Sequence, residues 1–228
     1  YILNHKKNIP ENGTMITTVV STPLLDTIVK KNGKKSLRVL TGFKYIGEKI
    51  RQFENKELDG TFLFGFEEAI GYLIGTHVRD KDAVVASMII AEMATTFENN
   101  GSSIYNEIMK IYEKYGWRLE ITVPVTKKGK DGLEEIQKIM KSMRAKNHTE
   151  IAGIKVKEYR DYQKGIEGLP KADVIQMVLE DETYLTVRPS GTEPKIKFYI
   201  SVVDSDRKVA ENKLTKMEKE FVNYAENL

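Results

Sequence analysis

The residue types best suited to chemistry gather in one short segment, residues 188–195 (R-P-S-G-T-E-P-K). A guanidinium can donate two parallel hydrogen bonds to phosphate oxygens, hydroxyls add neutral donors, and an ammonium adds a compact positive charge. A glycine can take a positive φ that turns neighbouring backbone N–H groups toward an anion, while prolines restrict the loop. The segment supplies each of these groups, in Arg188, Ser190, Gly191, Thr192 and Lys195. This composition predicts a loop that binds a phosphate dianion.

The surroundings of this loop distinguish it from an ordinary turn. A Ser-Gly pair alone is typical of a solvated hairpin turn. Here an apolar run precedes the loop and an alternating run follows it, so we expect two strands to end together there. The string R-P-S-G-T-E-P-K-I-K-F-Y also resembles the phosphate-binding loop of the α-D-phosphohexomutases, the phosphoglucomutase and phosphomannomutase family. The resemblance implies phosphate contacts from Arg188, Ser190, Gly191, Thr192 and Lys197, the last of which stands where many members have arginine.

A second segment, residues 65–72 (G-F-E-E-A-I-G-Y), follows a strand-like run and resembles the family's sugar-specificity loop, usually written G-E-E-S. The two oxygens of one carboxylate can accept hydrogen bonds from two adjacent sugar hydroxyls, and neighbouring residues of an extended segment point to opposite sides. We therefore expect Glu67 to face the sugar and Glu68 to point away, the alternative being a solvated acidic turn. Phe66 and Ala69 replace the family's glycine and serine, which leaves hexose and pentose substrates both open.

A third segment, residues 76–82 (T-H-V-R-D-K-D), resembles the family's R-x-K-D stretch. We expect it to open a helix with Asp80 as the N-cap. The resemblance implies that Lys81 lies near the transferring phosphoryl group as an electrostatic and proton-transfer aid, with Arg79 as a neighbouring positive charge. The alternative is a basic helix start with solvated side chains, and a lone histidine such as His77 is more often structural than catalytic.

A fourth segment, residues 40–46 (L-T-G-F-K-Y-I), predicts a strand end that turns into a helix and resembles the family's T-G-x-K element. A hydroxyl and backbone N–H groups at a helix N-terminus can bind an anion or a hydroxyl. The resemblance implies that Thr41, Gly42 and Lys44 face the sugar or its phosphate. Each segment alone means little, but all four occur in family order.

Two family elements do not occur in this sequence: the serine loop that carries the transferable phosphate, and the D-G-D-x-D-R metal loop. The resemblance therefore implies the third and fourth domains of a four-domain enzyme, with the nucleophile and the Mg²⁺ ligands on the missing N-terminal domains. We expect no metal ligands within this chain. We expect residues 1–10 to be a helix tail of the preceding domain, residues 11–115 the sugar-binding third domain, and residues 116–228 the phosphate-binding fourth domain.

Composition narrows the classes of function. The chain has 228 residues, of which 40% are hydrophobic, enough for two modest cores. Its net charge of +3 comes from interspersed acidic and basic residues, which argues against nucleic-acid binding. No apolar run approaches the roughly 20 residues of a membrane span. With no cysteine, the chain has no disulfide framework and no thiolate metal site, and we expect a cytoplasmic protein.

The order of strand-like and helical runs predicts an α/β fold class. Up to about residue 115 the runs alternate, which predicts an α/β layered domain with a mostly parallel sheet. Within it, a helix expected over residues 81–97 has little polar face and is predicted to be buried. Beyond Gly116, strand runs flanked by two helices predict an α+β domain with an antiparallel sheet and helices on one face. The final helix has a core stripe at 3-4-3 spacing: Leu214, Met217, Phe221 and Tyr224.

Together these features predict the substrate-binding half of a phosphoglucomutase, an intramolecular phosphotransferase that interconverts glucose 1-phosphate and glucose 6-phosphate. The resemblance implies glucose 1,6-bisphosphate as intermediate and activator, and a phosphoserine and Mg²⁺ outside this chain. We expect the chain alone to be inactive. The open alternatives are a phosphopentomutase or phosphomannomutase of the same family, and a non-catalytic phosphosugar-binding module.

Overall fold

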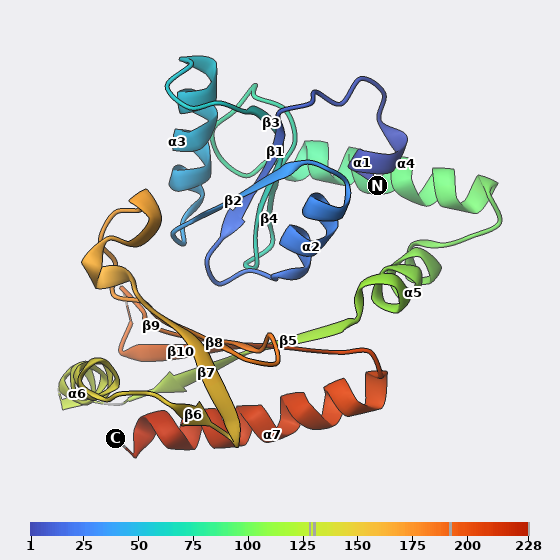
Figure 1. Cartoon of the computed structure of the whole chain (residues 1–228). Helices are drawn as coiled ribbons and strands as arrows, with labels where there is room; N and C mark the ends of the chain where they lie inside the picture. Colours follow the sequence, from blue (N-terminus) through green and yellow to red (C-terminus); the bar gives the residue numbers. More distant parts are fainter. Residues whose placement is uncertain (128, 130, 192, 228) are drawn as a thin grey trace. The chain divides into compact units, whose positions relative to one another are not determined.

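The computed structural model describes the chain except residues 128, 130, 192 and 228, and divides it into two compact units, Tyr1–Tyr115 and Gly116–Leu228 (Figure 1). Each unit has its own sheet and its own hydrophobic core. The second unit opens at Gly116, whose φ of 91° lies in the region that favours glycine. Within the described residues, no helix combines the length and hydrophobicity needed to cross a bilayer.

The first unit contains a four-stranded sheet of order β2-β1-β3-β4, in which only the β3–β4 pair is antiparallel. Every residue of β1 is buried, as expected for a central strand covered on both faces. The predicted mostly parallel α/β layer is therefore confirmed. Its elements are α1 (Ile2–His5), β1 (Gly13–Thr18), α2 (Leu24–Lys31), β2 (Lys35–Val39), α3 (Phe43–Glu54), β3 (Thr61–Glu67), β4 (Gly71–Leu73), α4 (Ala83–Asn99) and α5 (Ile104–Tyr115).

Helices α2 and α3 cover opposite faces of this sheet (Figure 1). The apolar residues of α3 recur every three or four positions, which places them on one face of the helix, where they pack with Ile16 of β1. The neighbouring Met15 points to the other face and packs with Leu25 and Val29 of α2. Apolar side chains thus fill both faces of the sheet. The polar groups that could contact a ligand are those at the carboxyl ends of the strands.

Helix α4 departs from the sequence-based prediction of a buried helix. Phe97 is its only buried residue, whereas Val84, Met88 and Ile90 are exposed. The helix has 17 residues and is about 25 Å long, but it packs against α5 and the three-residue strand β4, which are too short to cover it. Its inner side borders an apolar cavity of about 400 Å³ that α1 and α2 also line. Hydrophobic composition predicted a preference for burial, but not what would cover the helix.

The second unit is a six-stranded sheet of order β5-β10-β9-β8-β7-β6 in which every neighbouring pair is antiparallel. The predicted antiparallel α+β class is thus confirmed. Two short 3₁₀ turns, Tyr162–Lys164 and Ile166–Gly168, precede β8. The other elements are β5 (Trp117–Thr126), α6 (Asp131–Ala145), β6 (Glu150–Ile151), β7 (Ile154–Asp161), β8 (Ile175–Leu179), β9 (Tyr184–Pro189), β10 (Lys195–Asp204) and α7 (Arg207–Glu226).

The core of this unit lies between the sheet and helices α6 and α7. The predicted stripe of α7 faces this core: Met217 and Phe221 are buried, and Leu214 and Tyr224 pack against the cluster. The rings of Phe221 and Phe198 meet edge to face, with their centroids 5.7 Å apart. One face of β10 therefore packs against helix α7, and the residues between those core positions point to the other face of the sheet.

Candidate functional site

The carboxyl ends of the three parallel strands of the first unit meet at one edge of its sheet. In open α/β sheets, ligands bind at this edge, between two neighbouring strands whose following connections run to opposite sides. For the strand order 2-1-3 this switch point lies between the first and third strands. The chain leaves β1 toward β2 and leaves β3 toward β4, so the switch point lies between Thr18 and Glu67. The segment after β2, Thr41 and Gly42, reaches the same edge.

Glu67 ends β3 and is only 7% exposed. The backbone N–H of Gly42 donates a hydrogen bond of 2.6 Å to its Oε1. Gly42 is the N-cap of α3, and its φ of 122° is a conformation that favours glycine. The buried Glu67 carboxylate accepts from one of the backbone N–H groups at the helix N-terminus, where negative charge is favourable. The sequence analysis assigned both carboxylate oxygens to sugar hydroxyls; one is used by Gly42, and Oε2 has no partner among the described residues.

Thr41 adds a hydroxyl beside this contact. Its Oγ1 is the one buried side-chain polar atom of the described residues that has no hydrogen-bond partner. A buried hydroxyl without a partner costs free energy that a hydrogen-bonding ligand would recover. Thr41, Gly42 and Glu67 thus form a cluster at the strand ends that holds a buried hydroxyl without a partner and one carboxylate oxygen, Glu67 Oε2, without a partner among the described residues.

Glu68 is exposed, yet its carboxylate turns back to the end of β1. Its Oε2 accepts hydrogen bonds from the hydroxyls of Thr18, at 3.2 Å, and Ser21, at 3.1 Å. Both hydroxyl residues are buried, and they are 2.8 Å apart from oxygen to oxygen. Neither was predicted as a site residue; the signal available was a hydroxyl-rich S-T-P turn after a β-branched run.

Lys81 lies beside the cluster, although its surroundings differ from those expected. Its aliphatic chain crosses Gly71, the register partner of Glu67, where an added Cβ would come within 2.5 Å of Lys81 Cδ. Its ammonium is 5.4 Å from the ring centroid of Phe43 and 3.1 Å from a carboxylate oxygen of Asp80. The ammonium therefore has a carboxylate neighbour, whereas the expected neighbouring charge, that of Arg79, pairs with Glu54.

Of the other two cationic residues predicted for this unit, Lys44 lies next to Gly42, where an added Cβ would be 3.9 Å from its Cγ, and Arg79 lies apart from the cluster. Arg79 pairs with Glu54 at the last turn of α3, the opposite end from Gly42. Lys44 is exposed, with its ammonium 5.0 Å from the ring centroid of its neighbour Tyr45. The structure thus gives both residues local partners and does not bring Arg79 to the strand ends.

The helix start in the third segment also needs correction. Asp82, not Asp80, is the N-cap of α4, and it accepts hydrogen bonds from the amides of Val84 and Val85. His77 lies 2.8 Å from Asp82 and lowers the pKa of this carboxyl together with the two amides. The helix begins two residues later than predicted because the extended backbone of Asp82 suits an N-cap.

In the second unit, the predicted phosphate loop joins β9 to β10 as a hairpin. Arg188 and Lys197 face each other across the two strands, and their side chains have no hydrogen-bond or ion-pair partner among the described residues. Like charges in register repel each other, so an anion between them would be stabilised by both. Lys195 differs, because its ammonium pairs with Glu193 at 3.0 Å.

The loop borders a cavity of about 370 Å³ lined by Arg188, Ser190 and Gly191 together with α6. Gly191 does not use the positive φ that was expected. Its contribution is space, because an added Cβ would meet no atom within 4 Å. Thr192, the remaining predicted phosphate ligand, lies outside the described residues.

No group of three or more metal-ligating side chains occurs in the part of the chain that the structure describes. The available chemistry is hydrogen bonding at the strand ends of the first unit and cationic charge at the hairpin of the second. The groups of the first unit suit hydroxyls, and those of the second unit suit an anion.

Comparison with known proteins identifies the family. Residues 1–112 match "Phosphoglucomutase/phosphomannomutase, alpha/beta/alpha domain III", and residues 120–215 match "Phosphoglucomutase/phosphomannomutase, C-terminal domain". The chain therefore belongs to the phosphoglucomutase/phosphomannomutase family and holds its domains III and IV.

Individual relatives agree with this assignment. Phosphoglucomutase of Staphylococcus aureus strain MRSA252 is 36% identical over 200 residues, which cover 82% of this chain and 35% of the relative. That of strain USA300 is 36% identical over 199 residues, with the same coverage. The chain thus spans about a third of the length of these relatives.

Two solved structures resemble the whole chain. The Paramecium phosphoglucomutase pp63/parafusin, in its open form, superposes with a TM-score of 0.63 at 17% identity, over 93% of this chain and 37% of that one. A family protein of Burkholderia thailandensis gives a TM-score of 0.59 at 12% identity, with the same coverage. At these identities the likeness shows the fold alone.

Proposed function

We propose that this chain is the substrate-binding half of a phosphoglucomutase that interconverts glucose 1-phosphate and glucose 6-phosphate. The observation that carries the proposal is the facing pair Arg188 and Lys197, two cations without a partner among the described residues beside a hairpin loop. The curated relatives named above are phosphoglucomutases. The substrate, the reaction and the residue roles are our inference.

In this proposal the two units recognise different parts of one substrate. Arg188 donates two hydrogen bonds to the phosphate that is not being transferred, Lys197 adds charge, and Ser190, Gly191 and Thr192 complete the loop. Glu67 accepts a hydrogen bond from a sugar hydroxyl through Oε2, and Thr41 exchanges one through its unpartnered Oγ1. The sugar and its phosphate are thus held separately.

Such a division suits a reaction in which the sugar must present each end in turn. The phosphoryl group moves between C1 and C6 through glucose 1,6-bisphosphate, so either end must fit the same phosphate loop. Lys81, which lies against Gly71 and the ring of Phe43, stabilises negative charge and assists proton transfer at the reacting oxygen. We assign the phosphoserine and the Mg²⁺ ligands to a part of the protein outside this sequence, and expect no mutase activity from the chain alone.

Calorimetric titration of the chain with glucose 1-phosphate, ribose 1-phosphate, mannose 1-phosphate and inorganic phosphate tests the proposal. We expect glucose 1-phosphate to bind more tightly than inorganic phosphate, because only the sugar engages the first unit. Tighter binding of the pentose or of mannose would favour a phosphopentomutase or a phosphomannomutase. If no phosphosugar binds more tightly than phosphate, the sugar-binding role fails.

Activity separates a mutase half from a binding module. The assay adds the chain to a phosphoglucomutase lacking its last two domains and follows formation of glucose 6-phosphate. Restored turnover supports the mutase, and binding without any restored turnover favours a non-catalytic phosphosugar-binding module.

A further inference from the structure

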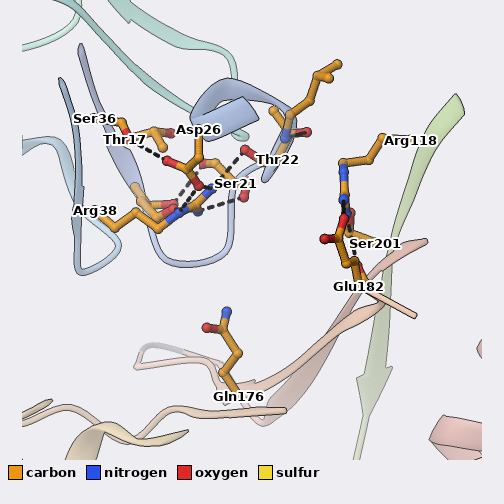
Figure 2. A network of polar contacts seen from close by, with 12 residues as sticks. Thr17, Ser21, Thr22, Asp26, Ser36, Arg38, Arg118, Gln176, Glu182 and Ser201 are labelled. Atoms are coloured by element: carbon orange, nitrogen blue, oxygen red, sulfur yellow. Dashed lines mark hydrogen bonds and ion pairs between the residues drawn. The ribbon is translucent and has the colours of Figure 1, made fainter. Parts of the chain in front are cut away.

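The turn that follows β1 is held by a single arginine from the neighbouring strand (Figure 2). Nη1 of Arg38, on β2, donates hydrogen bonds to the backbone oxygens of Thr18, at 2.8 Å, and Ser21, at 3.0 Å. Nη2 donates to the backbone oxygen of Thr22 at 3.0 Å. Three carbonyls of one five-residue turn therefore converge on one guanidinium.

Arg38 is itself oriented by an acidic residue at the start of α2. Its Nε and Nη2 donate to Oδ2 of Asp26 at 2.8 and 2.7 Å, and the hydroxyl of Ser36 donates to Oδ1 at 2.7 Å. The Arg38 side chain is 16% exposed and that of Asp26 is 38% exposed, so water is largely excluded from the guanidinium but not from the carboxylate. The fork geometry is specific to arginine, since a lysine could keep the charge but could not reach all of these oxygens.

The same turn is hydrogen-bonded to the end of β3 and to Glu68, the residue that follows it. The hydroxyls of Thr18 and Ser21 donate to Glu68, and the hydroxyl of Thr17 donates to the backbone oxygen of Phe66 at 2.9 Å. Thr18 and Ser21 thus bond to Arg38 through their carbonyls and to Glu68 through their hydroxyls. A change in the turn after β1 would move the segment that carries Glu67 as well.

We propose that Arg38 is a positioning residue for sugar recognition: it fixes the turn after β1, and through Thr18 and Ser21 it fixes the acidic segment Glu67-Glu68 at the switch point. This inference rests on the proposed function, because it assigns to Arg38 an effect on a phosphosugar that the arginine does not touch. It adds to the site a residue that the sequence motifs do not contain.

The test compares Arg38→Lys with a matched control, Lys35→Met. Lys35 lies on the same strand and pairs with Asp59, but its side chain is 57% exposed and lies at the amino end of β2. Hydrogen exchange of the Ser21 amide, which bonds to Thr18 O at 3.2 Å, reports the turn without any ligand. Titration with glucose 1-phosphate, well below the melting temperature, reports the site.

For Arg38→Lys we expect faster exchange at Ser21 and affinity for glucose 1-phosphate about tenfold weaker. Inorganic phosphate should bind unchanged, and Lys35→Met should match the wild type in all three measurements. A purely structural role would lower the melting temperature and leave affinity in the folded state unchanged, which would overturn the inference.

If Arg38→Lys does not fold, Asp26→Asn decides instead, since it keeps the arginine and loosens only its orientation. Unchanged sugar affinity in Asp26→Asn would also overturn the inference. A wild-type chain that binds no phosphosugar would instead reject the proposed function and this role with it, whereas equal binding by wild type and variant rejects this inference alone.

Discussion

At the strand ends of the first unit the polar side chains are bonded to one another, whereas the two facing cations of the second unit have no partner among the described residues. Glu67 holds the amide of Gly42, and Glu68 holds two hydroxyls. Arg188 and Lys197 face each other, and no carboxylate or carbonyl of the described residues bonds to the guanidinium or the ammonium. The hydrogen bonds of the first unit fix the orientation of its two carboxylates. The two facing positive charges of the second unit are not neutralised by a neighbouring group of the described residues.

This difference fits the two ligand groups proposed above, a sugar hydroxyl and a phosphate. A neutral hydroxyl contributes little charge, so it is recognised by an acceptor whose position is already set by other hydrogen bonds. A phosphate dianion is attracted by charge, which a neighbouring carboxylate would cancel. We therefore expect variants of the two units to differ in kind as well as in size.

The largest expected effect concerns the separate cores. Phe221→Ala removes a ring that is fully buried against Phe198 and should destabilise the second unit by about 3–5 kcal/mol. Because the first unit has its own core, its unfolding transition should not move. Trp117, the only tryptophan, reports the second unit by fluorescence, and calorimetry follows both. A single transition shifted as a whole would show that the units unfold together, and Lys219→Ala, on the exposed side of α7, serves as control.

The next largest effect is expected on phosphosugar binding, when Arg188 or Lys197 is removed. Arg188→Ala should weaken binding of glucose 6-phosphate by about 1.5–3 kcal/mol, and Lys197→Ala by less, because a guanidinium makes the bidentate contact. Neither change should lower the unfolding free energy by more than about 0.5 kcal/mol, since each removes a charge facing a like charge. Titration and chemical unfolding measure the two quantities, with Lys219→Ala again as control. Equal affinity in Arg188→Ala and wild type would remove Arg188 from the site.

A smaller effect is expected in the first unit, where it separates sugar reading from phosphate capture. Glu67→Gln keeps the shape and one acceptor oxygen but loses charge assistance, which should weaken glucose 1-phosphate binding by about 1–2 kcal/mol. Inorganic phosphate should bind normally. Glu68→Gln should cost less, because Glu68 is exposed and its hydroxyl partners can bond to the amide oxygen. A larger defect in Glu68→Gln than in Glu67→Gln would reverse the assignment of the sugar-facing carboxylate.

The smallest expected effect distinguishes the units by pH. His148, in the second unit, is buried between Met143 O and the hydroxyl of Tyr224, and burial lowers its pKa despite the hydrogen bond to the carbonyl. The folded state thus favours the neutral ring, whose Nδ1 accepts from Tyr224 while Nε2 donates to Met143.

Stability from this group is complete above the ordinary histidine pKa of about 6.5 and is lost as the pH falls through the lower folded value. The unfolding free energy of the second unit, followed through Trp117, should therefore decrease as the pH falls below about 6.5. His148→Gln should flatten this dependence. An identical slope in the variant would assign the pH effect to other groups.

Local pattern was enough for the fold class and for several element positions. The 3-4-3 spacing in α7 marked Met217 and Phe221 as core residues because helical periodicity depends only on the local sequence. The apolar and alternating runs around residues 188–195 predicted the β9–β10 hairpin for the same reason. The T-G pair at residues 41–42 likewise predicted the change from strand to helix.

Contacts between distant residues were beyond that pattern. Glu67 and Gly42 are 25 positions apart, and so are Arg79 and Glu54, yet the first pair forms part of the cluster and the second lies at the far end of α3. The exposed face of α4 follows from the short elements beside it rather than from its own residues.

By itself, the sequence determined which groups are present and the local elements that carry them: a cationic hairpin loop, an acidic pair at a strand end and a hydroxyl before a helix. Backbone propensity and side-chain periodicity act over a few residues, so they can be read directly. Only the tertiary structure decided that one oxygen of Glu67 belongs to Gly42, that Thr18 and Ser21 join the site, and that Arg38 holds them. Those contacts depend on strand order and register, which arise when a whole sheet packs and each polar group finds its partner.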